Sequence, residues 1–282
     1  MDGIIVLKKE AGMTSFDCVS NLRKKLGIKK IGHTGTLDKE VSGVLVICIG
    51  KATKLVDILV DHEKTYECII KLGIKTKTDD VFGEIIEEKV PINHSNSEID
   101  EVLDSFIGTY NQIPPMYSSV KVNGKKLYQY AVKDIEIERK PREIKIYELK
   151  RLSKIENNEF RFIVRSSKGL YVRTLCSDIA IKLGELGTMK HLERLKLGDY
   201  SIDEAKTLDE VNEADIIPLE AVLDKFPKVN VKDYLVPLVK NGITLDNRQT
   251  DIEGVFSVVN KNKILALYKK VEDNKYKPVV IL

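Results

Sequence analysis

An apolar run of seven residues, GVLVICI at positions 43–49, is the feature that most constrains how this chain folds. A run this short and this apolar is typical of a strand that is buried on both faces. It follows GHTGTLD at 32–38, where Gly32 and Gly35 permit positive φ angles and close approach to a ligand. Asp38 ends this loop, so a carboxylate is expected beside a buried strand, where loops commonly carry function. A simpler interpretation, in which Asp38 closes a turn or caps a helix, stays open from these residues alone.

Hydrophobic periodicity predicts further elements along the chain. Strands are expected at 4–7, 66–72, 144–152 and 160–164, and helices after Thr14, over 52–60, over 97–108 and over 173–183. Asn123-Gly124 predicts a tight turn. Hairpins with interspersed helices and few regular β-α-β units indicate an α+β fold with a largely antiparallel mixed sheet.

The chain changes character behind Phe226-Pro227. Short strand-like segments follow at 255–260, 264–268 and 278–282, separated by turns. We therefore predict two domains, a large one over residues 1–226 and a small β-rich one over 227–282.

Composition indicates an ordinary globular protein, with 43% hydrophobic and 32% charged residues. The sequence has no 18-residue apolar span and no basic-then-apolar leader, so we expect a cytoplasmic location and no membrane association. The four cysteines show no C-x-x-C spacing and are expected to be reduced core residues. The four histidines are dispersed as well, and no metal site is visible.

Charge is segregated along the chain although the net charge is only +3. Basic residues gather at 23–30, 121–126, 139–145 and 165–173, whereas 203–224 holds eight acidic residues against one basic residue. This distribution favours one face that binds a polyanion, because nucleic-acid affinity depends on clustered Lys and Arg. A solvated helix face is the alternative explanation for any single basic run.

Five separated motifs occur in order along the chain. They are AGMTSFD at 11–17; GHTGTLD at 32–38 followed by SGVL at 42–45; KTYE at 64–67; QIPPMYS at 112–118 followed by KVNGK at 121–125; and SKG at 167–169 followed by YVRTL at 171–175. With these motifs the chain resembles the bacterial tRNA pseudouridine synthase B family, the tRNA pseudouridine-55 synthases, over most of its length. The resemblance implies the pseudouridine synthase fold, with a PUA-like RNA-binding domain at 227–282.

The resemblance also implies the reaction. The family isomerises the uridine at position 55 in the T-loop of tRNA by breaking the C1′–N1 bond and joining C1′ to C5, with base flipping and no cofactor or metal. Asp38 matches the catalytic carboxylate, which acts either as nucleophile at C1′ or as base at C2′. A carboxylate in a water-poor pocket needs a nearby cation to stay charged. Arg173 matches the family arginine that pairs with it, and a purely structural ion pair is the alternative.

Other matched positions imply contacts with the substrate. Tyr66 matches the catalytic-site residue that stacks on the flipped base, and stacking worth about 1–3 kcal/mol offsets part of the cost of flipping. Its alternative role is a core tyrosine on an alternating strand. Tyr171 and Leu192 match positions that hold the detached base, and His33 matches a substrate contact. Asp80 matches a second acid that organises the pocket arginine.

The implied partner is the T-arm of tRNA, with no obligate protein partner evident. Besides Ser166 in place of a Cys and Leu170 in place of a Thr, the chain departs from the family pattern in two further places. Residues 39–43 read KEVSG where the family has Pro-Leu-Ala-Thr-Gly, and Glu193 replaces the first Arg of Leu-Arg-Arg. Loss of the Pro predicts a less rigid loop, and Glu193 predicts an altered RNA contact.

Two other functions compete with this interpretation. Residues 33–36, HTGT, are similar to the H-x-G-H loop of nucleotidyltransferases, but Thr36 stands where the second His is needed and no G-K-[ST] motif follows. A second alternative is an RNA-binding member of the family that refolds tRNA without catalysis. The retained Asp38, Tyr66 and Arg173 argue against it.

Overall fold

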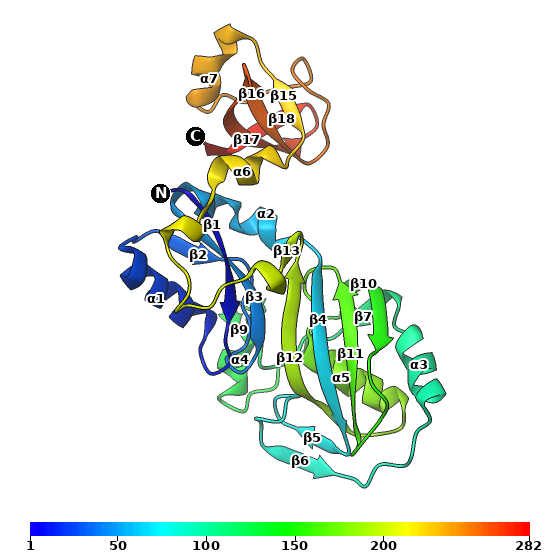
Figure 1. Ribbon diagram of the computed structural model, residues 1–282. Coiled ribbons are helices and arrows are strands. Elements are labelled where there is room, and N and C mark those ends of the chain that lie inside the picture. Colours follow the sequence, from blue (N-terminus) through cyan, green and yellow to red (C-terminus); the bar gives the residue numbers. More distant parts are fainter. The chain divides into compact units, whose positions relative to one another are not determined.

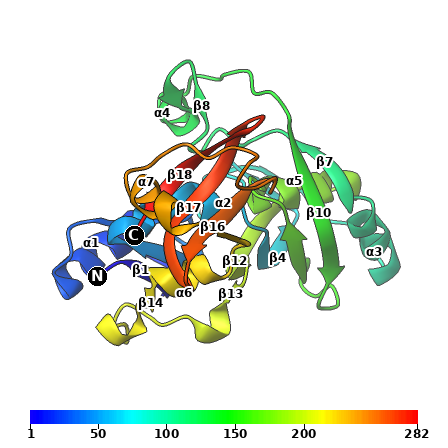
Figure 2. The ribbon, with the colours of Figure 1, turned by 90° about the horizontal axis from the view of Figure 1, so that it is seen from above.

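The computed structural model describes residues 1–282, and the chain forms two compact units. Unit 1 contains residues 1–40, 44–60 and 203–282, and unit 2 contains residues 41–43 and 61–202. The ribbon shows the strands and helices of both units from two directions (Figures 1 and 2). None of the helices is long and apolar enough to cross a bilayer.

The N-terminal sheet of unit 1 is built around the apolar run. Strand β3 (Ser42–Ile49) lies beside β1 (Gly3–Lys9), which pairs with β14 (Ile217–Pro218), and β2 (Ile31–His33) pairs antiparallel with β3. Every residue from 43 to 49 is buried, which confirms the predicted buried strand. Helix α1 (Ser15–Leu26) covers this sheet with Cys18, Val19 and Leu22. It begins within the predicted turn, where Thr14 is the N-cap and forms a capping box with Asp17.

Unit 1 also contains a four-stranded sheet in the order β15-β16-β17-β18, formed by Lys228–Asn230, Val255–Asn260, Lys263–Glu272 and Lys275–Ile281. Its aromatic centre is Phe256, which stacks on Tyr268 at 6.1 Å and meets Tyr276 edge-on at 5.5 Å between ring centroids. The three strands predicted after residue 255 are therefore present. The other elements of unit 1 are η1 (Gly50–Leu55), α2 (Val56–Val60), η2 (Ile202–Glu204, beginning at the last residue of unit 2), η3 (Glu213–Asp215), α6 (Leu219–Asp224), η4 (Asp233–Leu235) and α7 (Val236–Lys240).

Unit 2 is a mostly antiparallel sheet in the order β12-β4-β11-β10-β7, formed by Gly187–Leu197, Lys64–Leu72, Glu159–Ser166, Arg142–Arg151 and Gly108–Gln112. Strand β4 alternates as predicted, with Tyr66, Cys68, Ile70 and Leu72 buried. The predicted hairpin is the β10–β11 pair. Helix α5 (Val172–Lys182) packs against β12 and β4, and α3 (Asn96–Asp104) packs against β10, as Figure 2 shows. The remaining elements are β5 (Ile74–Thr76), β6 (Ile85–Glu88), β8 (Lys121–Val122), β9 (Lys125–Lys126), α4 (Leu127–Ala131) and β13 (Tyr200–Ser201).

Most strand pairs are antiparallel, and the parallel pairs are β3 with β12 and β15 with β16. The predicted α+β class with a largely antiparallel mixed sheet is therefore confirmed. Two predicted helices differ from the structure. The helix expected over 97–108 ends at Asp104, because Gly108 already pairs with Ile146 in the sheet. The helix expected over 52–60 is a 3₁₀ segment to Leu55 followed by one short α-helix.

Gly43 is the position where the parallel β3–β12 pair leaves no room for a side chain. Its φ is +117°, and a Cβ there would lie 2.3 Å from the carbonyl oxygen and 2.5 Å from the amide nitrogen of Arg194. Both clashes are with backbone, which cannot rotate away. Glycine is therefore required for the pairing of Gly43 with Arg194.

We predict that Gly43→Ala destabilises the protein by about 2–4 kcal/mol, because it combines an unfavourable φ with a backbone clash. Gly27→Ala is the matched control, since Gly27 also has a positive φ, +66°, but has no atom near the position of a new Cβ. The free energy of unfolding of the control should fall by only about 1 kcal/mol. Denaturant unfolding measures both, and equal losses would contradict the requirement for Gly43.

Candidate active site

Asp38 is preceded by a residue whose backbone is fixed on both sides by one buried hydroxyl. The Ser15 hydroxyl donates to the Leu37 carbonyl at 3.2 Å and accepts from the Leu37 amide at 3.0 Å. Ser15 is 1% exposed and begins α1, while Leu37 is buried and turns its side chain inward. This double hydrogen bond attaches the Asp38 loop to the start of a packed helix.

The backbone that follows Asp38 is held by a second pair of donors. The Lys39 carbonyl accepts from the Gly12 amide at 2.9 Å and from the Lys9 ammonium at 3.1 Å. Lys9 is 0% exposed, and its ammonium also donates to the Glu10 carbonyl at 3.0 Å. We expected the loop to be less rigid without the family Pro at position 39, but four hydrogen bonds restrain the residues on either side of Asp38.

The loop before Asp38 uses one of its two glycines as predicted. Gly35 has φ +79°, a left-handed conformation that favours glycine. The predicted positive φ was wrong for Gly32, which lies in β2 with an ordinary φ and space for a side chain. Thr34 anchors the loop because its amide and hydroxyl both donate to the Val46 carbonyl, at 3.0 and 3.2 Å. Asp38 itself is exposed, so the protein does not provide the dry environment that we expected around this carboxylate.

Arg173 lies in the first turn of α5 in unit 2 and is only 6% exposed. Its guanidinium donates to two main-chain carbonyls, Thr78 at 2.7 Å and Tyr117 at 2.8 Å. Carbonyl acceptors hold the planar guanidinium in one orientation while leaving its charge intact. The loops that contain residues 78 and 117 therefore determine where this charge points.

Asp80 lies close to the same guanidinium. Its Oδ2 is 3.9 Å from Arg173 Nη1, while Oδ1 accepts from the Thr78 hydroxyl at 2.8 Å and from the Phe82 amide at 3.1 Å. The distance to Arg173 is too long for a hydrogen bond, so the attraction is mainly electrostatic. Asp80 thus shapes the loop whose carbonyl also orients Arg173.

Tyr171, the residue before α5, is held by Gln112 from β7. The Tyr171 amide donates to Gln112 Oε1 at 2.8 Å, and Gln112 Nε2 donates to the Tyr171 carbonyl at 3.0 Å. Gln112 is 1% exposed. The Gln112 side-chain amide therefore pairs with the main chain of Tyr171 as a neighbouring strand would. It thereby fixes the start of α5, the helix that carries Arg173.

Tyr66 and Leu192 lie on the adjacent strands β4 and β12. Tyr66 is opposite Arg194, and Leu192 is opposite Cys68, so the two residues are offset by two positions in the same ladder. Each is 7% exposed. Burial to this degree is compatible with a residue of the core and with a residue in the wall of a base pocket.

The two departures from the family pattern meet in the structure. Ser42 and Glu193 are opposite each other in the β3–β12 pair, and the Ser42 hydroxyl donates to Glu193 Oε1 at 3.2 Å. Glu193 is therefore used in a contact within the protein. The hydrogen bond strengthens the junction at which Gly43 pairs with Arg194.

Ser15, Lys9 and Gln112 are the site-forming residues that sequence reasoning missed. Ser15 and Gln112 stand in two of the five motifs, at 11–17 and 112–118, so their positions carried a signal that was not assigned to a role. Lys9 stands outside the motifs, and a buried lysine has no sequence signature. His33 lies at the end of β2, five residues before Asp38. No cluster of three or more His, Cys, Asp or Glu side chains with the spacing of a metal site occurs in the structure.

Comparison with family models gives two adjacent matches. The TruB family pseudouridylate synthase N-terminal domain matches residues 23–172, and the tRNA pseudouridylate synthase B C-terminal domain matches residues 173–238. Curated relatives named tRNA pseudouridine synthase B include one from Bacillus pumilus, which is 46% identical over 100% of this chain and 98% of its own length. Another, from Streptococcus sanguinis, is 45% identical over 99% of this chain and 98% of its own length.

Solved structures with the same fold include the Cbf5 proteins. The chain matches one in a Cbf5-Nop10-Gar1 complex with a TM-score of 0.72 and 27% identity, over 99% of this chain and 83% of that one. It matches one in an archaeal box H/ACA sRNP Nop10-Cbf5 complex with a TM-score of 0.70 and 25% identity. This match covers 99% of this chain and 85% of that one. The predicted pseudouridine synthase fold is therefore confirmed.

We predict that Ser15→Ala loosens the backbone next to Asp38. Alanine leaves the buried Leu37 amide without its acceptor, at a cost of about 1–3 kcal/mol. Hydrogen exchange at the Leu37 amide should accelerate about 5- to 100-fold, because local opening becomes easier by that amount. Ser20→Ala, on the same helix, is the control and should leave this exchange unchanged; equal exchange in both variants would contradict the role of Ser15.

Lys64 gives a prediction for pH dependence. Burial, with a smaller contribution from Arg194, lowers the pKa of Lys64 from 10.5 to about 8. Between these values the unfolded chain holds a proton that the folded chain lacks, so stability rises with pH in this window. Denaturant unfolding at about pH 7 and about pH 10.5 measures the free energy of unfolding of both proteins. Over this range, the free energy of unfolding of wild type should rise by about 1–3 kcal/mol relative to that of Lys64→Met. Lys196→Met, an exposed position on β12, controls for general charge effects, and a difference between wild type and Lys64→Met that does not vary with pH would refute the shifted pKa.

Proposed function

The chain belongs to the TruB family of tRNA pseudouridine synthases, and from that membership we propose that its substrate is the uridine at position 55 in the T-loop of tRNA. The coarser activity follows from the family itself: the protein is an isomerase that converts a uridine of tRNA to pseudouridine. The T-arm as the recognised element and the cytoplasm as the location are parts of the proposal.

The proposed reaction rearranges one nucleotide without gain or loss of atoms. The C1′–N1 bond breaks, the uracil turns, C1′ joins C5, N1 takes up a proton and C5 releases one. Asp38 is the proposed catalytic group, either as nucleophile at C1′ or as base at C2′. Since Asp38 is exposed in the protein, we propose that the bound RNA excludes water from it, so that the carboxylate becomes reactive only on substrate.

The observation that carries this proposal is the restraint on the Asp38 loop. Hydrogen bonds to Leu37 and Lys39 hold the backbone on both sides of an exposed carboxylate. A turn residue or a surface aspartate needs no such restraint, whereas a catalytic group must be held within a fraction of an ångström. The remaining roles are proposed from the resemblance. Arg173 supplies the positive charge that keeps the carboxylate ionised, with Asp80 in support.

The base is proposed to be held by three residues. Tyr66 stacks on it, and Tyr171 and Leu192 retain it after the C1′–N1 bond breaks. His33 is proposed to contact the substrate near the flipped nucleotide. No metal and no cofactor take part in this mechanism.

The division into a catalytic domain, residues 1–226, and a PUA-like RNA-binding domain, residues 227–282, is also a proposal. The sheet β15–β18 supports it, because these strands bury their own cluster around Phe256, Val258 and Tyr268. In this arrangement the small domain binds tRNA away from the reacting nucleotide.

We predict that Asp38→Asn abolishes turnover while RNA affinity stays within a few-fold of wild type, because the amide keeps the shape of the carboxylate. The rate of pseudouridine formation should fall by at least about 100-fold. Mass analysis and chemical-adduct mapping of an unmodified tRNA transcript measure the product and its position. Asp251→Asn, an exposed aspartate in the same unit, is the control.

The outcomes separate the parts of the proposal. Product at a uridine other than position 55 would contradict the T-loop assignment alone. Wild-type protein that binds the transcript and forms no pseudouridine would favour the RNA-binding alternative. A large loss of binding in Asp38→Asn would mean that Asp38 is structural.

A further inference from the structure

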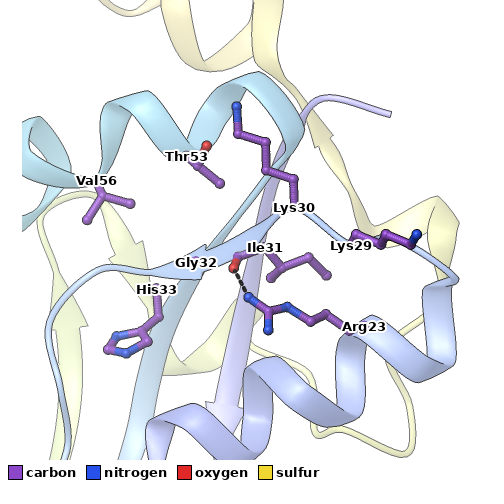
Figure 3. A pocket seen from close by; sticks show the side chains of 8 residues that line it. All are labelled: Arg23, Lys29, Lys30, Ile31, Gly32, His33, Thr53 and Val56. Carbon is purple, nitrogen blue, oxygen red and sulfur yellow. Dashed lines mark hydrogen bonds between the residues drawn. The ribbon is translucent and has the colours of Figure 1, made fainter.

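A basic pocket lies on unit 1 at the start of the Asp38 loop. It measures about 720 Å³, and its walls come from the end of α1, the turn into β2, β2 itself and the η1–α2 segment (Figure 3). The lining residues are Arg23, Lys29, Lys30, Ile31, Gly32, His33, Thr53 and Val56. Three of the eight carry a permanent positive charge and none carries a negative one.

The three cations of this pocket have no carboxylate partner. Neither Arg23 nor Lys29 nor Lys30 takes part in an ion pair, whereas basic residues of unit 2 such as Arg165 and Lys168 are paired with acids. Like charges that share one wall repel each other, and a bound anion relieves that repulsion. The pocket is therefore suited to an anionic ligand.

Arg23 is held in place by the strand that it lines. Its Nη2 donates to the Ile31 carbonyl at 3.1 Å, the hydrogen bond drawn in Figure 3. A guanidinium has five N–H donors, so this bond orients the group and leaves donors for a ligand. Arg23 combines a fixed position with an unneutralised charge, as phosphate recognition by arginine requires.

The outer edge of β2 adds main-chain donors to the pocket. The Lys30 carbonyl and the Thr34 amide both bond toward β3, with Gly50 at 2.8 Å and Val46 at 3.0 Å. In an antiparallel pair, alternate residues point their N–H and C=O groups to opposite sides of the strand. Ile31 lies between Lys30 and Thr34 at an alternate position, so its N–H and C=O point away from β3. The Ile31 amide therefore faces the same open edge as the Ile31 carbonyl that binds Arg23, and Gly32 contributes no side chain that would cover it.

We propose that this pocket binds a backbone phosphate of the RNA substrate next to the reacting nucleotide. Arg, Lys and main-chain N–H groups are the usual donors to phosphate oxygens. His33 lines the pocket and Asp38 follows five residues later, at most ~18 Å along an extended chain. A phosphate bound here lies within a few nucleotides of the uridine, and the inference rests on the proposed function for the identity of that RNA.

The test measures RNA affinity apart from catalysis. Asp38→Asn protein, which makes no product, is titrated with a labelled T-arm transcript between about 50 and 200 mM salt, with and without Lys30→Ala or Lys29→Ala. Each lysine variant should weaken binding about 3- to 10-fold and reduce the slope of log Kd against log salt by about 1. Lys24→Ala is the matched control: it is exposed on the same segment, carries the same charge and does not line the pocket.

The control should change the affinity by less than about 2-fold at each salt concentration, since it removes a charge without removing a phosphate contact. In single-turnover experiments, Lys24→Ala with Asp38 intact should react at the wild-type rate. Equal affinities and equal slopes for the Lys30 and Lys24 variants would overturn the proposal.

Two further arms identify the source of the phosphate and separate this inference from the proposed function. Inorganic phosphate at micromolar concentration that displaces the RNA would assign the pocket to a free anion and overturn the RNA assignment. Wild-type pseudouridine formation together with unaltered binding by both pocket variants would refute the pocket and leave the function standing. Absence of pseudouridine from wild-type protein would refute the function, while the binding comparison would still decide whether the pocket contacts RNA.

Discussion

The restraint of the Asp38 loop by the N-terminal segment is the interaction on which the candidate site depends. Ser15 holds Leu37 through two hydrogen bonds, and Gly12 and Lys9 hold Lys39 through its carbonyl. The loop thereby becomes part of the same rigid body as α1 and β1, whose side chains form the core of unit 1. The backbone on both sides of this exposed carboxylate is thus held by hydrogen bonds to main-chain groups, without a proline in the loop.

In unit 2, hydrogen bonds to main-chain groups likewise hold Arg173 in place. Arg173 is buried and donates to the carbonyls of Thr78 and Tyr117, while Gln112 bonds the main chain just before the helix that carries it. Neutral acceptors orient the guanidinium without cancelling its charge, so it keeps its electrostatic influence. In both units the residue proposed to take part in the reaction is positioned through polar groups that belong to distant segments of sequence.

The departures from the family pattern acquire a joint explanation. Ser42 and Glu193 replace family residues at positions far apart in the chain, yet they are opposite each other in the β3–β12 pair and share a hydrogen bond. They lie next to Gly43, where a Cβ would collide with the Arg194 backbone. Glu193, for which we expected only an altered RNA contact, accepts a hydrogen bond from Ser42 inside the protein, which the sequence alone did not indicate.

Local patterns were sufficient to predict most elements. The apolar run at 43–49, the alternation of Tyr66 to Leu72 and the cap at Thr14 each depend on neighbouring residues, so the sequence by itself determined these strands and this helix start. Motif order determined the family and the candidate residues, including Asp38 and Arg173. Only the tertiary structure decided that Gly32 is an ordinary strand residue, that the helix from Asn96 stops at Asp104 and that Ser15, Lys9 and Gln112 position the site. These outcomes depend on which backbone groups of distant segments face each other, and hydrogen bonds across tens of residues leave no periodicity in the sequence.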